Sequence, residues 1–133
     1  MSKMSTDLRN VRPMFDLCGR NYIVTGGAQG IGFAVTQAIC EMGGNVAVLD
    51  IQESPIPEFY SLGALFGSQP IYIRTDVRNE NSINQAFNKV LLAFETLHGL
   101  VPAAGIAIDK PFVDQTWDEF TRIQEINVSS NLR

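Results

Sequence analysis

The sequence predicts an α/β protein with a doubly wound parallel sheet. Two observations lead to this fold class: strand-like apolar runs alternate with helical stripes along the chain, and the first strand runs directly into a glycine-rich turn. The composition agrees, because 45% of the 133 residues are hydrophobic and 18% are charged, which is typical of one globular domain. Such alternation favours right-handed crossovers that place helices on both faces of the sheet.

The first half of the chain supplies two strands and the helix between them. Residues 21–25 are rich in β-formers, and residues 45–49 are nearly all apolar, as in a strand buried on both faces. Asp50 closes the second strand, and Gly43 and Gly44 stop the helix. The helix itself is indicated by apolar residues at helical spacing, namely Ile31, Ala34, Val35, Ala38, Ile39 and Met42.

The second half repeats this alternation. Pro55 and Pro57 allow a helix only from about residue 57 onward, because proline interrupts a helix interior. Residues 71–74 predict a third strand, and residues 99–104 predict a fourth that ends in a turn.

Two longer helices follow the third and fourth strands. The stripe of the first consists of Ile83, Ala86, Phe87, Val90, Leu91, Phe94 and Leu97. Thr116 and Glu119 have the spacing of a capping box and predict the start of the last helix. Its stripe consists of Trp117, Phe120, Ile123 and Ile126. We therefore expect a polar N-terminal arm at residues 1–18 and one domain at residues 19–133.

Composition excludes several classes of function. Ten Lys and Arg against fourteen Asp and Glu give a net charge of −4 without a basic cluster, which predicts no nucleic-acid partner and no binding to anionic membranes. One His and two Cys do not supply a zinc-ligand set, so we expect no metal. The chain lacks an apolar run long enough to span a membrane and a secretory h-region, so we expect a cytoplasmic protein with reduced thiols.

The most informative segment is the turn from Thr25 to Gly32, which reads Thr-Gly-Gly-Ala-Gln-Gly-Ile-Gly. Glycines let the backbone turn sharply and approach a ligand, and the following helix directs its unpaired N–H groups and positive dipole end at that ligand. A pyrophosphate suits this position. Asp50, which ends the next strand, stands where a carboxylate binds the adenosine ribose. The sequence therefore predicts a dinucleotide site.

The spacing of this turn, Thr-Gly-x-x-x-Gly-x-Gly, resembles that of the short-chain dehydrogenase/reductase family, which has a Rossmann-type fold. The resemblance extends from about Phe15 to Val128. Asp76-Val77 stands at the family's acidic position near the adenine ring, and Ala103-Ala104-Gly105 stands at its usual Asn-Asn-Ala-Gly. Pro102 and Ala103 thus replace the Asn pair, whose first member ties neighbouring strands in the family.

The resemblance implies which residues form the site. Asn127 stands at the family's structural and catalytic Asn and is the one catalytic residue expected in this chain. The implied cofactor-binding positions are Thr25, Gly26, Gln29, Gly30, Ile31, Gly32, Asp50, Ile51, Asp76, Val77, Ala103, Ala104 and Gly105. Asp50 would bind the free ribose hydroxyl of NAD and repel the 2′-phosphate of NADP. Because Gln29 stands where NADP users often have a basic residue, we expect NAD rather than NADP.

The remaining catalytic residues of the family are missing. The family uses a Ser and a Tyr-x-x-x-Lys pair for hydride transfer. The residues four positions after Tyr22, Tyr60 and Tyr72 are Gly, Ala and Asp, not Lys. We therefore expect an incomplete half-domain, truncated after the fourth strand and its following helix, in which the fourth strand is an exposed edge.

Three functions remain open. In the first, the chain is part of an NAD-dependent oxidoreductase, which acts on a small-molecule alcohol or ketone when complete. The resemblance implies that full-length relatives form homo-oligomers. Alternatively, it is a non-catalytic NAD-binding module, or a non-functional truncated product. In each case we expect the isolated chain to be inactive as an enzyme.

Overall fold

The computed structural model describes residues 12–132 and contains one parallel sheet. Its strands are β1 (Asn21–Thr25), β2 (Asn45–Asp50), β3 (Ile71–Arg74) and β4 (Gly99–Pro102), in the order β3-β2-β1-β4. All neighbouring pairs are parallel, with Ile23 opposite Ala47 on one side and Leu100 on the other. This is the strand order of a Rossmann-type half, and it confirms the predicted fold class.

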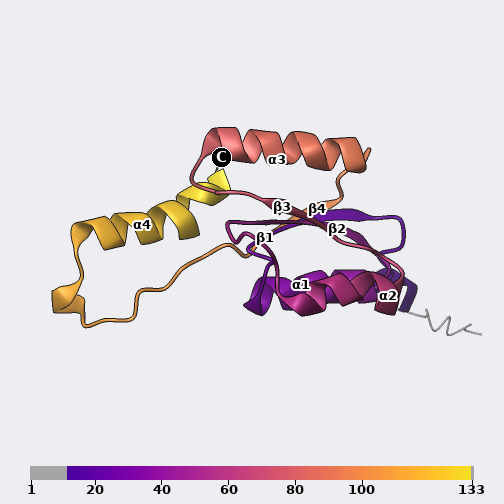
Figure 1. The fold of residues 1–133 in the computed structure, drawn as a ribbon, viewed down its shortest axis with the longest axis horizontal. Coiled ribbons are helices and arrows are strands. Elements are labelled where there is room, and N and C mark those ends of the chain that lie inside the picture. Colours follow the sequence, from indigo (N-terminus) through magenta and orange to yellow (C-terminus); the bar gives the residue numbers. More distant parts are fainter. Residues whose placement is uncertain (1–11, 133) are drawn as a thin grey trace, which may run out of the picture.

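Helices cover both faces of this sheet (Figure 1). On one face lie α1 (Gly30–Glu41) and α2 (Leu62–Phe66), the latter preceded by a 3-10 turn at Pro57–Ser61, and on the other lies α3 (Glu80–Ala93). Helix α4 (Trp117–Asn127) lies beside the sheet, at the end of a long connection from β4 that contains a 3-10 turn at Phe112–Asp114. The chain is therefore doubly wound around the sheet, and its last helix covers neither face.

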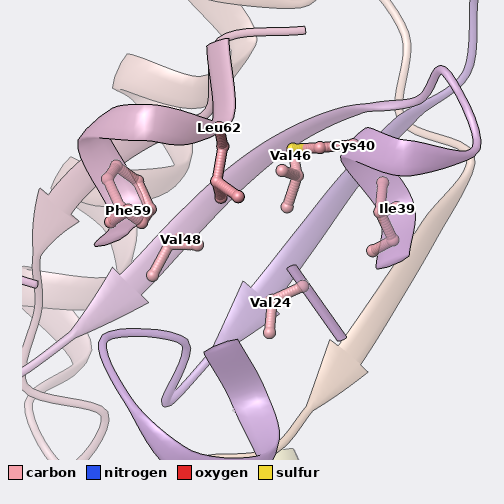
Figure 2. Packing of buried hydrophobic residues seen from close by; sticks show 7 residues of the cluster. All are labelled: Val24, Ile39, Cys40, Val46, Val48, Phe59 and Leu62. Carbon is pink, nitrogen blue, oxygen red and sulfur yellow. The ribbon is translucent and has the colours of Figure 1, made fainter. Parts of the chain in front are cut away.

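Each face of the sheet has its own apolar core. Figure 2 shows the layer between the sheet and helices α1 and α2, which consists of Val24, Ile39, Cys40, Val46, Val48, Phe59 and Leu62. The layer under α3 consists of Ile23, Ala47, Leu49, Ile73, Ala86 and Val90. Alternate residues of β1 and β2 point to opposite layers, so the central strands are buried on both faces as their apolar sequences predict.

Two predicted boundaries are wrong. The fourth strand ends at Pro102 instead of residue 104, because Pro102 already pairs with Thr25, the last residue of its neighbour β1. The long helical stripe ends early as well, since Phe94 has an extended backbone and caps α3, which leaves Leu97 outside the helix. The first three strands, the late start of the α2 region and the capping box of α4 are confirmed.

Three predicted apolar stripes are partly wrong. The side chain of Ile31 is 82% exposed, and the residues that α1 buries are Gly32, Thr36, Ile39 and Cys40. Thr36 fits the core because its hydroxyl donates to the Gly32 carbonyl oxygen at 2.9 Å. Leu91 of α3 is half exposed. In α4 only Ile126 is buried, whereas Trp117 and Phe120 stack on each other at 5.3 Å and stay exposed.

Strand β4 is the edge of the sheet in this chain, as predicted, and Leu100 on it is 52% exposed. Among residues 12–132, no helix is long and apolar enough to cross a membrane, and no group of metal-ligating side chains is present. Cys18 and Cys40 are both free thiols. The first 11 residues of the predicted arm lie outside the described residues, and the proposed boundary at residue 18 stays a prediction.

Candidate cofactor site

A cavity of about 350 Å³ lies at the carboxyl ends of the strands. The turn between β1 and α1, the end of β2, the connection after β3 and the loop after β4 together form its wall. Ligands of open parallel sheets bind at this edge. Every predicted cofactor position except Thr25 lines it: Gly26, Gln29, Gly30, Ile31, Gly32, Asp50, Ile51, Asp76, Val77, Ala103, Ala104 and Gly105.

The glycines of the turn allow a very close backbone approach. Gly26 has φ +71°, and a Cβ built on it would lie 2.6 Å from the backbone nitrogen of Ala104. A Cβ on Gly32 would lie 2.1 Å from the carbonyl oxygen of Gly26. Gly30 also has a left-handed φ of +59°. These positions need glycine for geometric reasons that hold whether or not a ligand is bound.

The start of α1 is suited to an anion. Its N-cap residue Gln29 makes no side-chain capping bond, and its first turn carries no acidic residue. The first N–H groups of a helix have no acceptor within the helix, and the helix dipole adds partial positive charge there. Since Gly30, Ile31 and Gly32 all line the cavity, this end of the helix faces the space where a phosphate would lie.

Asp50 brings a negative charge to the same cavity. Its side chain is 8% exposed; Oδ2 accepts the N–H of Ala28 and Oδ1 accepts the N–H of Gln52, each at 3.0 Å. Within residues 12–132 it forms no ion pair. A carboxylate oxygen accepts two hydrogen bonds, so each oxygen keeps one position for a hydroxyl donor.

The loop that follows Asp50 is held from strand β3. The Tyr72 hydroxyl donates to the Gln52 carbonyl oxygen at 2.8 Å, and Nε of Arg74 donates to the Ile51 carbonyl oxygen at 3.4 Å. Burial, and then the nearby charge of Asp50, raise the pKa of Tyr72 to about 12. The phenol therefore stays protonated and keeps donating at physiological pH.

Asp76 and Arg78 form an ion pair in the cavity wall. Arg78 donates from Nε to Oδ1 at 3.0 Å and from its terminal nitrogen to Oδ2 at 2.7 Å, and its backbone N–H also donates to Oδ1. These bonds from Arg78 hold the pKa of Asp76 below its ordinary value. The neighbouring Asn79 caps α3 by accepting the N–H of Ser82, which fixes this segment at the start of a helix.

Two predicted site residues lie outside the cavity wall. The Thr25 hydroxyl accepts the backbone N–H of Ala104 at 3.2 Å and so joins the ends of β1 and β4. The Asn127 amide binds the backbone of Ile106 twice, accepting its N–H and donating to its carbonyl oxygen, both at 2.9 Å. Both side chains thus position the loop after β4, and the catalytic role expected for Asn127 stays a prediction.

A family model described as short chain dehydrogenase matches residues 20–133, most of the chain. The chain belongs to the short-chain dehydrogenase family. A short-chain dehydrogenase/reductase of Armillaria gallica is 35% identical over 112 residues, which cover 83% of this chain and 43% of that protein. The chain spans about half the length of the curated relatives it matches.

Solved structures of the short-chain dehydrogenase family share this fold. A short-chain type dehydrogenase/reductase from Mycobacterium marinum gives a TM-score of 0.86 at 28% identity, covering 93% of this chain and 50% of that one. An NADPH-dependent 3-quinuclidinone reductase from Rhodotorula rubra gives a TM-score of 0.81 at 29% identity, covering 93% and 47%.

Sequence reasoning missed part of the wall. The cavity is also lined by Leu49, Gln52, Thr75, Arg78 and Ile126. The signal for Arg78 was present, because it stands two residues after Asp76, within reach of that carboxylate. The sequence gives no reason to expect the others in the wall. Leu49 is an ordinary apolar residue of a strand, and Ile126 reaches the cavity from α4, which is distant in the sequence.

Proposed function

We propose that this chain binds NAD and forms the cofactor-binding half of an oxidoreductase of the short-chain dehydrogenase type. One observation carries the proposal: the amide-rich start of α1 and the carboxylate of Asp50 face the same cavity at the carboxyl edge of the sheet. This pairing of a positive and a negative group matches the phosphates and the ribose hydroxyls of a dinucleotide.

The residues present fit such a cofactor. Gly30 lines the cavity, and nothing lies within 4 Å of a Cβ built on it, so the surface of the turn is open there. The two unused acceptor positions of Asp50 suit neighbouring hydroxyls. When bound, the nicotinamide ring supplies or accepts the hydride. The residues of this chain bind and orient it, and we propose a small-molecule alcohol or ketone as the substrate of the complete protein.

We propose NAD over NADP. The carboxylate of Asp50 is buried and has no cationic partner among the described residues, so it would repel a 2′-phosphate placed beside it. One protein of similar structure, the reductase from Rhodotorula rubra, is described as NADPH-dependent. Glu53, whose carboxylate pairs with Arg74 at 3.2 Å, further reduces the positive charge near this loop.

A second candidate is an NAD-binding module without catalysis. It is favoured by the sequence, because none of the three tyrosines is followed four residues later by the lysine that the family uses. We propose that the 133 residues by themselves bind the cofactor but do not turn over substrate. Asn127, which holds the backbone of Ile106, would then act in catalysis only together with residues from outside this sequence. The free thiols suit a cytoplasmic location.

Calorimetric titration of the full chain with NAD and with NADP tests this proposal. We expect NAD to bind more tightly, and Asp50→Ala to weaken NAD binding about tenfold, the value of a hydrogen bond to a charged group. The control is Asp109→Ala, an exposed acid outside the cavity wall, which should not change NAD affinity. Equal affinity of the parent chain and Asp50→Ala for NAD would refute the ribose assignment.

A further inference from the structure

A phenol on strand β3 is connected to the Asp50 carboxylate through one loop residue. The Tyr72 hydroxyl donates to the Gln52 carbonyl oxygen at 2.8 Å, and the Gln52 N–H donates to Oδ1 of Asp50 at 3.0 Å. Gln52 and Asp50 line the cavity, whereas Tyr72 does not. The phenol therefore holds a residue of the cavity wall without reaching the space of the cofactor.

The ring of Tyr72 has a rigid support. Its centroid lies 5.8 Å from that of Phe59 at an interplanar angle of 79°, an edge-on contact that aromatic pairs favour. Phe59 is 3% exposed, and Tyr72 packs against the buried cluster to which Phe59 belongs. Because this layer is closely packed, the hydroxyl reaches the loop from a fixed position.

The two carboxylate oxygens of Asp50 have unequal supports. Oδ2 accepts the N–H of Ala28, which is 1% exposed, whereas Oδ1 accepts the N–H of Gln52 in an exposed loop. Arg74 also bonds to this loop, but its bond is 3.4 Å long and its side chain is 63% exposed. The shorter bond from the packed phenol of Tyr72 is therefore the stronger support on the Oδ1 side.

We propose that Tyr72 is a positioning residue for ribose recognition, which acts through Gln52 to hold the Asp50 carboxylate in the orientation that binds the adenosine ribose. Without the phenol hydroxyl, the loop samples further conformations, and only the correctly oriented fraction of molecules binds the cofactor tightly. The affinity then falls although no contact to the cofactor is lost. This inference rests on the proposed function, because it concerns the ribose end of the same site.

A double-mutant cycle, measured by calorimetric titration of the full chain with NAD, tests this role. Tyr72→Phe keeps the ring and its contact with Phe59 and removes only the hydroxyl. It should weaken NAD binding about fivefold, as expected for the loss of one hydrogen bond. In an Asp50→Ala background the same change should weaken NAD binding by less than about 1.5-fold, because the carboxylate that the phenol positions is gone.

Tyr60→Phe is the matched control. Tyr60 also contacts Phe59 edge-on at 5.8 Å, but it is 65% exposed, so the loss of its hydroxyl should leave NAD affinity unchanged. If circular dichroism shows that Asp50→Ala does not fold, Asp50→Asn takes its place as the background. An amide has one oxygen, so it cannot hold both N–H groups in the way that the two carboxylate oxygens do.

Amide hydrogen exchange measures the same role without a cofactor. In the ligand-free Tyr72→Phe chain, the Gln52 N–H should exchange about fivefold faster than in the parent chain, since its loop has lost the bond from the phenol. The Ala28 N–H, on the other oxygen of Asp50, should keep its rate. A general loss of structure would accelerate both amides and would contradict the positioning role.

The outcomes separate the two proposals. If NAD does not bind the parent chain, the proposed function is wrong, and the positioning role fails with it. If NAD binds the parent chain and Tyr72→Phe equally well, the positioning role is wrong and the proposed function stands. The same conclusion follows if Tyr72→Phe weakens binding equally in both backgrounds, or if the Gln52 N–H exchanges at the parent rate.

Discussion

Replacing Gly32 with alanine should destabilise the protein and should also weaken NAD binding, because it moves the start of α1 in the wall of the candidate cofactor site. Gly32 lies in the first turn of α1 and is buried. A Cβ at this position would lie 2.1 Å from the Gly26 carbonyl oxygen and 2.7 Å from the Gly26 carbonyl carbon, whereas ordinary contacts begin at 3.4 Å. The contacted atoms belong to the backbone, and Gly26 is itself bonded through its N–H to the Leu49 carbonyl oxygen, so they cannot rotate away.

The expected cost follows from two opposing terms. Alanine is favoured over glycine inside a helix by about 1 kcal/mol. Overpacking a tight interior costs typically about 1–3 kcal/mol, and a clash with fixed backbone belongs at the upper end. We therefore expect a net loss of about 2 kcal/mol in the free energy of unfolding, or a melting temperature lower by about 6 °C for a domain of this size.

Circular dichroism melts and NAD titration measure the two effects. Binding should weaken at least tenfold, because moving α1 away from Gly26 by about 1 Å breaks hydrogen bonds that tolerate only a few tenths of an ångström. The control is Gly67→Ala at the end of α2, where φ is +77° but nothing lies within 4 Å; it should lose stability from backbone strain alone and keep its NAD affinity. A Gly32→Ala variant that melts and binds like the parent would refute the steric argument.

Three other perturbations have defined outcomes. Val48→Ala, at a residue with 0% exposure, should cost about 2 kcal/mol in urea denaturation, whereas Leu92→Ala, at 90% exposure, should change stability by less than about 0.5 kcal/mol. Burial raises the pKa of Tyr72 to about 12, so the free energy of unfolding should fall as the pH rises from about 10 to about 12. Tyr72→Phe should reduce that loss. If the variant and the parent chain lost the same stability over this pH range, the burial of the phenol would be contradicted. Asn127→Ala removes two hydrogen bonds to Ile106, so limited proteolysis should cut the loop after β4 faster while the protected amides of β1 and β2 exchange as before.

The sheet was predictable because its signals are local. Each central strand is a short run of β-formers that ends at glycines or a carboxylate, and the alternation with helices fixes parallel order. The lining of the cavity was predictable for a similar reason: in a parallel sheet the turns after successive strands meet at one edge, so residues far apart in the sequence line one cavity.

The helical stripes were less predictable, because periodicity identifies apolar residues but not the side from which the sheet approaches. In α1 the sheet packs on Gly32, Thr36 and Cys40, which are small enough for close approach, and Ile31 is left in the cavity wall. Periodicity also cannot detect the end of α3 at Phe94, where the chain turns extended to reach β4.

By itself, the sequence determined the order of the elements, the glycine turn and the acid that follows it, because these depend on backbone freedom and on charge within a few residues. Only the tertiary structure decided that Arg78 neutralises Asp76 in the cavity wall, and that Thr25 and Asn127 hold the loop after β4 outside that wall. Such roles depend on which partner a polar side chain reaches in space, and the packing of the strands and helices selects that partner.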